Sequence, residues 1–217
     1  MKWPILFGKN RNRPTTGRWH DWKQVIADDC EGRCIYCAIA EARFGGIRNF
    51  HIEHFRPRVR FPDLEDDIRN LYLACAICNV LKCDDWPADP IADHSIPAYP
   101  DPSLVDYNSI FELVPNTHEV SSSTVAGTYV IRRMALNRAQ LIIERRRIAV
   151  QAQIDEFNDW VETTLDSLTP GEQRDVIKVL AAVSKAQSAA MTARPYEDAD
   201  TKRPGRRVTK NRKRRAS

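Results

Sequence analysis

The clearest hydrophobic periodicity lies in the C-terminal half of the chain. Apolar residues recur at helical spacing over residues 136–168, and a second stripe of this kind runs over residues 176–190. Between them, residues 169–172 (Thr-Pro-Gly-Glu) have the composition of a helix N-terminus, with a Thr cap, Pro at the first helical position and Glu at the third. The pattern predicts two helices that pair as an antiparallel hairpin over residues 136–193.

The first half of the chain predicts shorter elements. Residues 21–31 have helical spacing, residues 49–55 have the composition of a short strand, and residues 70–74 are a short apolar segment. A charged loop over residues 56–69 separates the last two. A further helix is expected to open over residues 79–82.

The middle of the chain is rich in proline and then in β-forming residues. Five prolines over residues 85–102 predict an extended, loop-like segment. Strands are expected over residues 111–115 and 128–131, on either side of a Ser-rich loop. Together these elements predict an α+β protein that ends in a helical hairpin.

Composition divides the chain further. We expect a basic N-terminal segment (1–20), a central domain (21–135), the hairpin packed on it or extending it (136–193), and a disordered basic tail (194–217). The chain has 217 residues and a net charge of +4, but residues 202–217 alone carry +9 and the first 20 residues +5. The remainder is therefore acidic, and affinity for a polyanion is expected to come largely from the two ends.

The apolar segments are all short. No run approaches the roughly 20 residues that span a bilayer, and the apolar part of the N-terminus is too short for a secretory signal. We therefore expect a cytoplasmic protein whose six cysteines are thiols or metal ligands rather than disulfides.

Two Cys-x-x-Cys pairs stand out among these cysteines. Each such turn presents two thiolates from one tight bend, and zinc prefers four such ligands in a tetrahedron. The sequence therefore predicts a structural zinc site made by Cys34, Cys37, Cys75 and Cys78. Cys30 and Cys83 are interpreted as packing or incidental residues, because the spacing of Cys30 to Cys34 is less typical of a zinc site.

A cluster of polar residues lies between and beside the two cysteine pairs. Glu53 and His54 are adjacent, so that one can face a metal ion while the other reaches a water molecule. Asn79 directly follows a zinc-site cysteine, and Asn70 is placed to orient His54. A carboxylate with an amide oxygen suits Mg²⁺ or Mn²⁺. His51 remains open as an extra ligand, a partner of Glu53 or a structural residue.

These motifs resemble the HNH endonuclease superfamily, whose active site is a ββα-metal finger. The resemblance covers about residues 30–85 and is carried by Cys34-x-x-Cys37, Glu53-His54, Asn70-Leu71 and Cys75-x-x-Cys78-Asn79-x-x-Lys82. It implies that Glu53 and Asn79 bind the catalytic metal, that His54 is the general base, and that Asn70 holds the loop and His54 in place. In many such proteins a Gly follows near Lys82, where this chain has Cys83.

The amino-acid sequence of residues 51–82, together with that of residues 136–146, also resembles HNH proteins of bacterial anti-phage systems, including the Septu type. In that type an ATPase accompanies the nuclease. The resemblance includes Arg56 and Lys82, which it favours as phosphate contacts, whereas Arg58 and Arg60 are as readily explained by a solvated loop. The tail adds further expected nucleic-acid contacts, among them Arg212, Lys213, Arg214 and Arg215.

Two functions from different classes follow from these residues. The first is a metal-dependent HNH endonuclease that hydrolyses DNA, with a structural Zn²⁺, a catalytic Mg²⁺ or Mn²⁺, and an ATPase or sensor subunit as a further partner. The second is a non-catalytic zinc module that binds nucleic acid or a protein. Both explain the cysteine pairs and the basic tail, but only the first explains Glu53-His54 together with Asn70 and Asn79.

Overall fold

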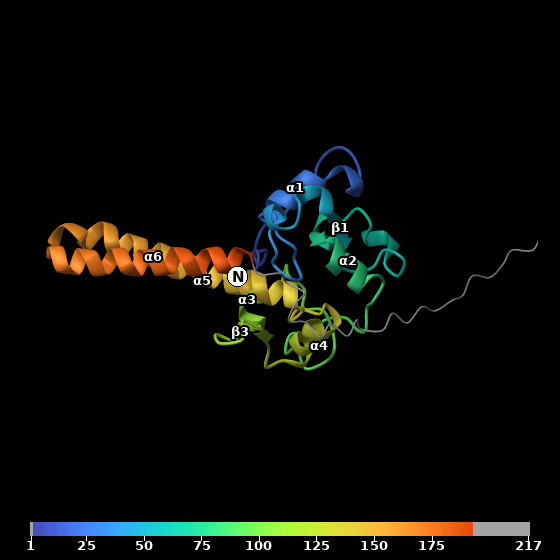
Figure 1. Ribbon diagram of the computed structural model, residues 1–217. Helices are drawn as coiled ribbons and strands as arrows, with labels where there is room; N and C mark the ends of the chain where they lie inside the picture. Colours follow the sequence, from blue (N-terminus) through green and yellow to red (C-terminus); the bar gives the residue numbers. More distant parts are fainter. Residues whose placement is uncertain (1, 193–217) are drawn as a thin grey trace, which may run out of the picture.

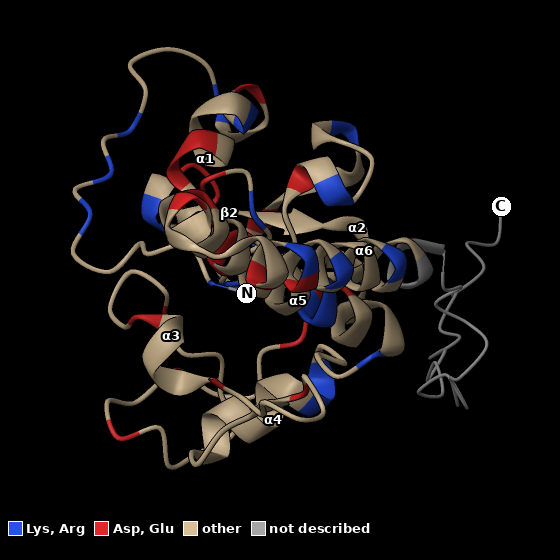
Figure 2. Ribbon diagram, turned by 60° about the vertical axis from the view of Figure 1, so that its left-hand side comes forward, with Lys and Arg blue, Asp and Glu red and all other residues tan. Residues whose placement is uncertain are grey.

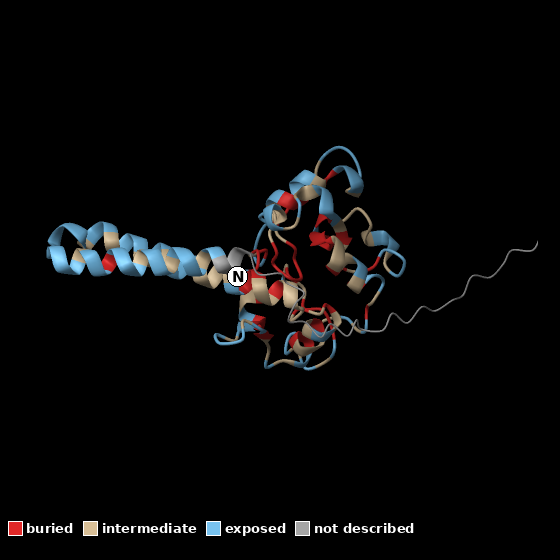
Figure 3. Ribbon diagram, viewed as in Figure 1, coloured by how far each residue is buried: buried red, intermediate tan, exposed pale blue. Residues whose placement is uncertain are grey.

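Two long helices project as an arm from the rest of the molecule (Figure 1). The computed structural model describes residues 2–192, so the predicted disordered tail and its basic residues lie outside the described residues. The arm is formed by α5 (Ala139–Thr164) and α6 (Pro170–Thr192). Buried residues concentrate in the body, and most of the arm is exposed (Figure 3). The arrangement is the predicted α+β fold with C-terminal helices.

A two-stranded antiparallel sheet followed by a helix forms the centre of the body. Strand β1 (Phe50–His54) pairs with β2 (Leu71–Cys75), so that Phe50 lies opposite Cys75 and Glu53 opposite Tyr72. Every residue of β2 is buried, since α1 (Lys23–Asp29) packs against it. Helix α2 (Ala76–Lys82) begins directly after β2, three residues earlier than predicted. The ββα order of the predicted metal finger is therefore present.

Short 3₁₀ turns shape most of the remaining connections. They are η1 (Trp19–Asp21), η2 (Glu41–Arg43), η3 (Ile47–Asn49), η4 (Pro62–Leu64), η5 (Ile68–Asn70) and η6 (Leu165–Ser167). The turn η4 lies within the predicted charged loop between β1 and β2, and η5 begins there and ends one residue beyond it, at Asn70. The N-terminal segment is anchored to the body by Trp3, whose indole nitrogen donates to the Tyr36 carbonyl at 3.1 Å.

The strand predicted over residues 128–131 is wrong. These residues lie in α4 (Val125–Arg133), which Thr124 caps by accepting a hydrogen bond from the Gly127 amide. Ala126, Val130 and Met134 are buried at a spacing of four residues, which is helical periodicity. The β-branched residues in this segment favoured a strand locally, but burial of this face selects the helix.

A second small sheet precedes α4. It pairs β3 (Glu112–Leu113), part of the predicted strand 111–115, with β4 (Val120–Ser121). The short helix α3 (Tyr107–Ile110) comes immediately before it.

The helical hairpin of the arm is confirmed, and so is its cap. The Thr169 amide and hydroxyl both donate to Glu172, and the Glu172 amide donates back to the Thr169 hydroxyl. The two helices lie side by side in Figure 1 and share a hydrogen bond from Gln187 to Gln151. Within the described residues, no helix combines the length and apolar character needed to cross a lipid bilayer.

Helix α2 ends at a residue with an unusual backbone conformation. Cys83 follows the helix with φ +49° and ψ −130°, a conformation that L-residues rarely adopt and that glycine adopts freely. The resemblance noted above implies a glycine near this position in many HNH proteins. The cysteine therefore holds strain at the end of the helix that carries Asn79.

We predict that Cys83→Gly stabilises the protein. Strained positions of this kind cost about 1–3 kcal/mol, and glycine's added freedom in the unfolded chain offsets part of the gain, so a net gain of about 1 kcal/mol is expected. Urea unfolding followed by circular dichroism measures it. Cys83→Ala is the matched control, because it removes the thiol and keeps the strain. Equal stability of the two variants would contradict the prediction.

Candidate active site and metal cluster

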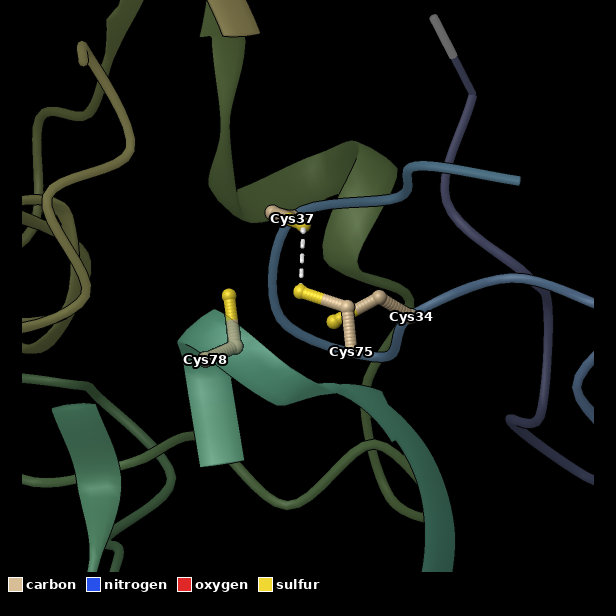
Figure 4. Close-up of side chains that lie close together, drawn as sticks. All are labelled: Cys34, Cys37, Cys75 and Cys78. Carbon is tan, nitrogen blue, oxygen red and sulfur yellow. Dashed lines mark hydrogen bonds between the residues drawn. The ribbon is translucent and has the colours of Figure 1, made fainter. Parts of the chain in front are cut away.

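Four cysteine thiols meet at one point between the two halves of the finger (Figure 4). Their sulfur atoms all lie within 4.8 Å of one another, and the Cys37 and Cys75 sulfurs are 3.8 Å apart. A tetrahedron with Zn–S bonds of about 2.3 Å has edges of about 3.8 Å, so the cluster has the size of a zinc site. Hydrogen bonds from the other three thiols hold the pKa of Cys75 well below its usual range, whereas burial raises the pKa of Cys34. The cluster consists of the predicted Cys34, Cys37, Cys75 and Cys78.

Two arginines near the root of the arm, one partly buried and one buried, lie near this cluster. Nη2 of Arg138, the residue before α5, is 3.8 Å from the Cys78 sulfur. Arg145 is 1% exposed, and burial lowers its pKa to about 10 while the nearby Cys37 acts in the opposite direction. Among the described residues, Nε of each arginine is buried without a hydrogen-bond partner. Four thiolates around a divalent ion carry a net charge of −2, which two guanidinium groups balance.

Cys30 lies outside the cluster, as the sequence indicated. Its sulfur accepts a hydrogen bond from the Leu73 amide at 3.3 Å, and burial raises its pKa to about 11. Cys30 therefore stays a thiol that packs behind β2.

A cavity of about 1330 Å³ opens beside the finger. Three of the predicted active-site residues, Glu53, His54 and Asn79, line it. Glu53 and His54 come from the end of β1, and Asn79 comes from the middle of α2, directly after the cluster residue Cys78. The structure therefore brings a carboxylate, an imidazole and an amide to one solvent-accessible site.

Glu53 is a buried carboxylate with a specific set of partners. Its Oε1 accepts a hydrogen bond from the Tyr36 hydroxyl at 3.2 Å and lies 2.8 Å from Nζ of Lys82. Burial raises the pKa of Glu53, and the Lys82 ammonium opposes that rise. Because these contacts are all made to Oε1, Oε2 is the oxygen left for a ligand in the cavity.

His54 is half-buried, and its ring is fixed from two sides. Nε2 lies 3.1 Å from the carbonyl oxygen of Glu65, and the Trp19 ring packs edge-on against the imidazole with centroids 4.9 Å apart. A carbonyl oxygen only accepts, so Nε2 carries the hydrogen and Nδ1 is the basic nitrogen. Burial lowers the pKa of His54, which favours the neutral base at neutral pH.

Asn70 does not contact the imidazole in the way the sequence led us to expect. Its amide group accepts from the Arg56 amide at 2.8 Å and donates to the carbonyls of Arg56 and Leu64, both at 3.1 Å. The next residue after Leu64 supplies the carbonyl that holds His54. Asn70 therefore ties together the two ends of the loop between β1 and β2, and it acts on His54 only through that loop.

The two cations favoured as phosphate contacts lie elsewhere. Lys82 is completely buried and donates to the His54 carbonyl as well as to Glu53, so it does not reach a phosphate from this position. Arg56 packs over the rings of Phe61 and Trp86 and is not among the residues that line the cavity.

Arg58 is the cation of this loop that does line the cavity. The sequence had explained it equally well as part of a solvated charged surface. His51, by contrast, is exposed, lies opposite Ala74 and does not line the cavity, so its placement does not support a ligand role.

Several cations of the N-terminal segment are already paired. Arg11 is buried, with Nε 2.9 Å from Asp29, and the Arg18 guanidinium lies 3.1 Å from both Glu65 and Asp66. These contacts fasten the segment to the body, so they reduce the charge that this end offers to a polyanion.

Sequence reasoning missed several polar and aromatic residues that line the cavity. Asp84 follows α2 by two residues and raises the pKa of Glu53 electrostatically, so it is a further carboxylate near the site. The closeness of Asp84 to Lys82 in the sequence could have indicated that Asp84 lies near the site. Trp19, Arg132 and Arg133 come from segments remote in sequence, where no local pattern pointed to the site.

Comparison with known proteins agrees with this geometry. Residues 34–85 match the model of the HNH endonuclease family. The matched segment begins at the first cluster cysteine and ends just after α2, so it contains the whole ββα finger. No curated protein and no solved structure matches the chain. The family match thus covers residues 34–85 only, and no comparison assigns the segments on either side to a family.

We predict a strong coupling between Glu53 and Lys82 in the HNH region. Lys82→Met leaves a buried carboxylate without its cation and is expected to cost about 3–5 kcal/mol of stability, as is usual when one partner of a buried pair is removed. Adding Glu53→Gln removes the orphaned charge and should recover at least about 2 kcal/mol of that loss. A double-mutant cycle by urea unfolding measures the coupling. Additive effects of the two substitutions would show that the pair is not coupled.

Proposed function

We propose that this protein is a metal-dependent endonuclease that hydrolyses DNA phosphodiester bonds. The observation that carries the proposal is the meeting of Glu53, His54 and Asn79 at one cavity within the region that matches the HNH endonuclease family. A base, a carboxylate and an amide oxygen at one open site are the groups that metal-assisted phosphodiester hydrolysis requires.

Glu53 Oε2 and the Asn79 side-chain oxygen would hold a divalent cation, and hard oxygen ligands of this kind suit Mg²⁺ or Mn²⁺. Such an ion supplies charge stabilisation to the scissile phosphate and the leaving oxygen. His54 takes a proton from the attacking water through Nδ1, since Nε2 is engaged by the Glu65 carbonyl. Lys82 and Tyr36 hold Glu53 in position, and Asn70 holds the loop that carries the Glu65 carbonyl.

The four-cysteine cluster would hold a structural Zn²⁺. Four thiolates complete a tetrahedral set and leave no open position for a substrate. The ion would link the loop at residues 34–37 to the β2–α2 junction, and so fix Asn79 relative to β1.

The resemblance to anti-phage HNH proteins extends the proposal to a biological role. The chain would be the nuclease component of a bacterial defence system, acting with an ATPase or sensor subunit, and the exposed arm offers such a partner a surface. Trp160 and Ile177 on the arm are 45% and 63% exposed, which supports this assignment. Co-purification with the products of neighbouring genes tests it.

We predict that the protein nicks plasmid DNA only when Mg²⁺ or Mn²⁺ is present. His54→Ala should lower the rate by at least about a hundredfold, because general-base catalysis contributes 10²–10⁴-fold. Conversion of supercoiled plasmid to nicked and linear forms measures the rate, with EDTA as the metal-free control. His51→Ala is the matched control, since His51 is an exposed histidine of the same strand that does not line the cavity.

Equal behaviour of wild type and His54→Ala with each metal and partner would contradict the enzyme assignment. That result would favour the alternative, a zinc module that binds nucleic acid or a protein without cleaving it.

We also predict about one zinc ion per chain, from four thiolate ligands. Elemental analysis of the purified protein should find it, and Cys75→Ser should remove it and lower the melting temperature. Cys30→Ser is the matched control, because Cys30 is equally buried but lies outside the cluster. Loss of zinc from both variants alike would contradict the assignment of ligands.

A further inference from the structure

The wall of the cavity contributed by α4 is outside the segment that matches the HNH family. Tyr129, Arg132 and Arg133 from this helix line the cavity together with Glu53 and His54. Both arginines belong to the last turn of the helix, and Figure 2 shows basic residues near the α4 label. Two positive side chains thus lie in the same cavity as the active-site groups, contributed by a segment far along the chain.

The two arginines differ in what already binds them. Nε of Arg133 lies 3.1 Å from Asp85, which also accepts hydrogen bonds from the hydroxyls of Tyr99 and Tyr129. This network neutralises Arg133 and fixes the end of α4. Arg132 is exposed, and among the described residues it has no ion pair. Its charge is available to a ligand, at a position made rigid by its neighbour.

Arg58 is a second cation that lines the cavity, from the β1–β2 loop. Its side chain is 55% exposed, its guanidinium lies over the Trp19 ring at 5.6 Å, and its contact with Glu65 is long, at 3.5 Å. The cavity therefore has Glu53 and His54 on β1 and Asp84 just after α2, and guanidinium groups on the β1–β2 loop and α4. A polyanion with charges spaced along a chain complements this distribution better than a single small anion does.

We propose that Arg132 binds a phosphate of the nucleic-acid backbone next to the scissile phosphate, with Arg58 as the second contact of the same kind. The ligand class is a phosphodiester chain, held without regard to base sequence, since both groups are suited to phosphate oxygens. The proposal rests on the proposed function, and it assigns the binding of the substrate backbone to a helix that the HNH match does not include.

Binding measured without cleavage tests the proposal. In a His54→Ala background with Mg²⁺ present, fluorescence anisotropy gives the affinity for a labelled duplex over a series of salt concentrations. Arg132→Gln should weaken binding about tenfold at low salt and flatten the log–log salt dependence by about 0.9, the contribution of one phosphate contact. Arg132→Lys should keep the slope, because the charge remains.

Arg48→Gln is the matched control, since Arg48 is an exposed arginine that has no ion pair among the described residues and does not line the cavity. If Arg132→Gln binds DNA with the same affinity and slope as Arg48→Gln, the proposal is overturned. Plasmid nicking by the protein with His54 intact is measured in a separate experiment. If the protein does not nick DNA but Arg132→Gln has a flattened slope, the endonuclease is refuted and the phosphate site is supported. If the protein nicks DNA but Arg132→Gln has an unchanged slope, the endonuclease is supported and the phosphate site is refuted.

Discussion

Four thiols from two distant segments converge at the centre of this protein, and the arrangement of the remaining site depends on that convergence. One pair comes from a loop after α1, and the other spans the junction of β2 and α2. The second pair brackets the start of α2, so any ion bound there also sets the direction of the helix that carries Asn79. The two arginines near the cluster extend the dependence to the arm, because Arg138 immediately precedes α5 and Arg145 lies within its second turn.

A second constraint is the burial of charge beneath the candidate active site. Glu53 and Lys82 form a close pair that is almost entirely shielded from water. Desolvating two charges is costly, and such a pair persists only when its geometry and its additional hydrogen bonds are good. Tyr36 and the His54 carbonyl supply those bonds. The pair thus holds the carboxylate through its Oε1, in a residue that lines the cavity.

The residues of the β1–β2 loop act through the backbone rather than directly. Asn70 uses its amide group to join the beginning and end of that loop, and the loop in turn presents a carbonyl to His54. Trp19 completes the arrangement from the N-terminal segment, where the Arg18 ion pairs hold it against the same loop. The protonation pattern of the imidazole therefore follows from contacts made by several segments.

Local signals in the sequence predicted the elements and motifs that are short in range. The cysteine pairs, the Glu-His dipeptide, the strands of the finger and the cap at Thr169 each depend on neighbouring residues, whose spacing determines turns, strand faces and helix ends. Residues 128–131 were mistaken for a strand because β-branched side chains favour one locally, whereas the buried stripe of α4 depends on packing against the body. Only the tertiary structure decided that Lys82 is buried against Glu53, that Arg56 faces aromatic rings, and that Arg132 and Trp19 reach the cavity. The physical reason is that burial and charge pairing depend on which segments meet in space, and the spacing of residues along one segment does not contain that information.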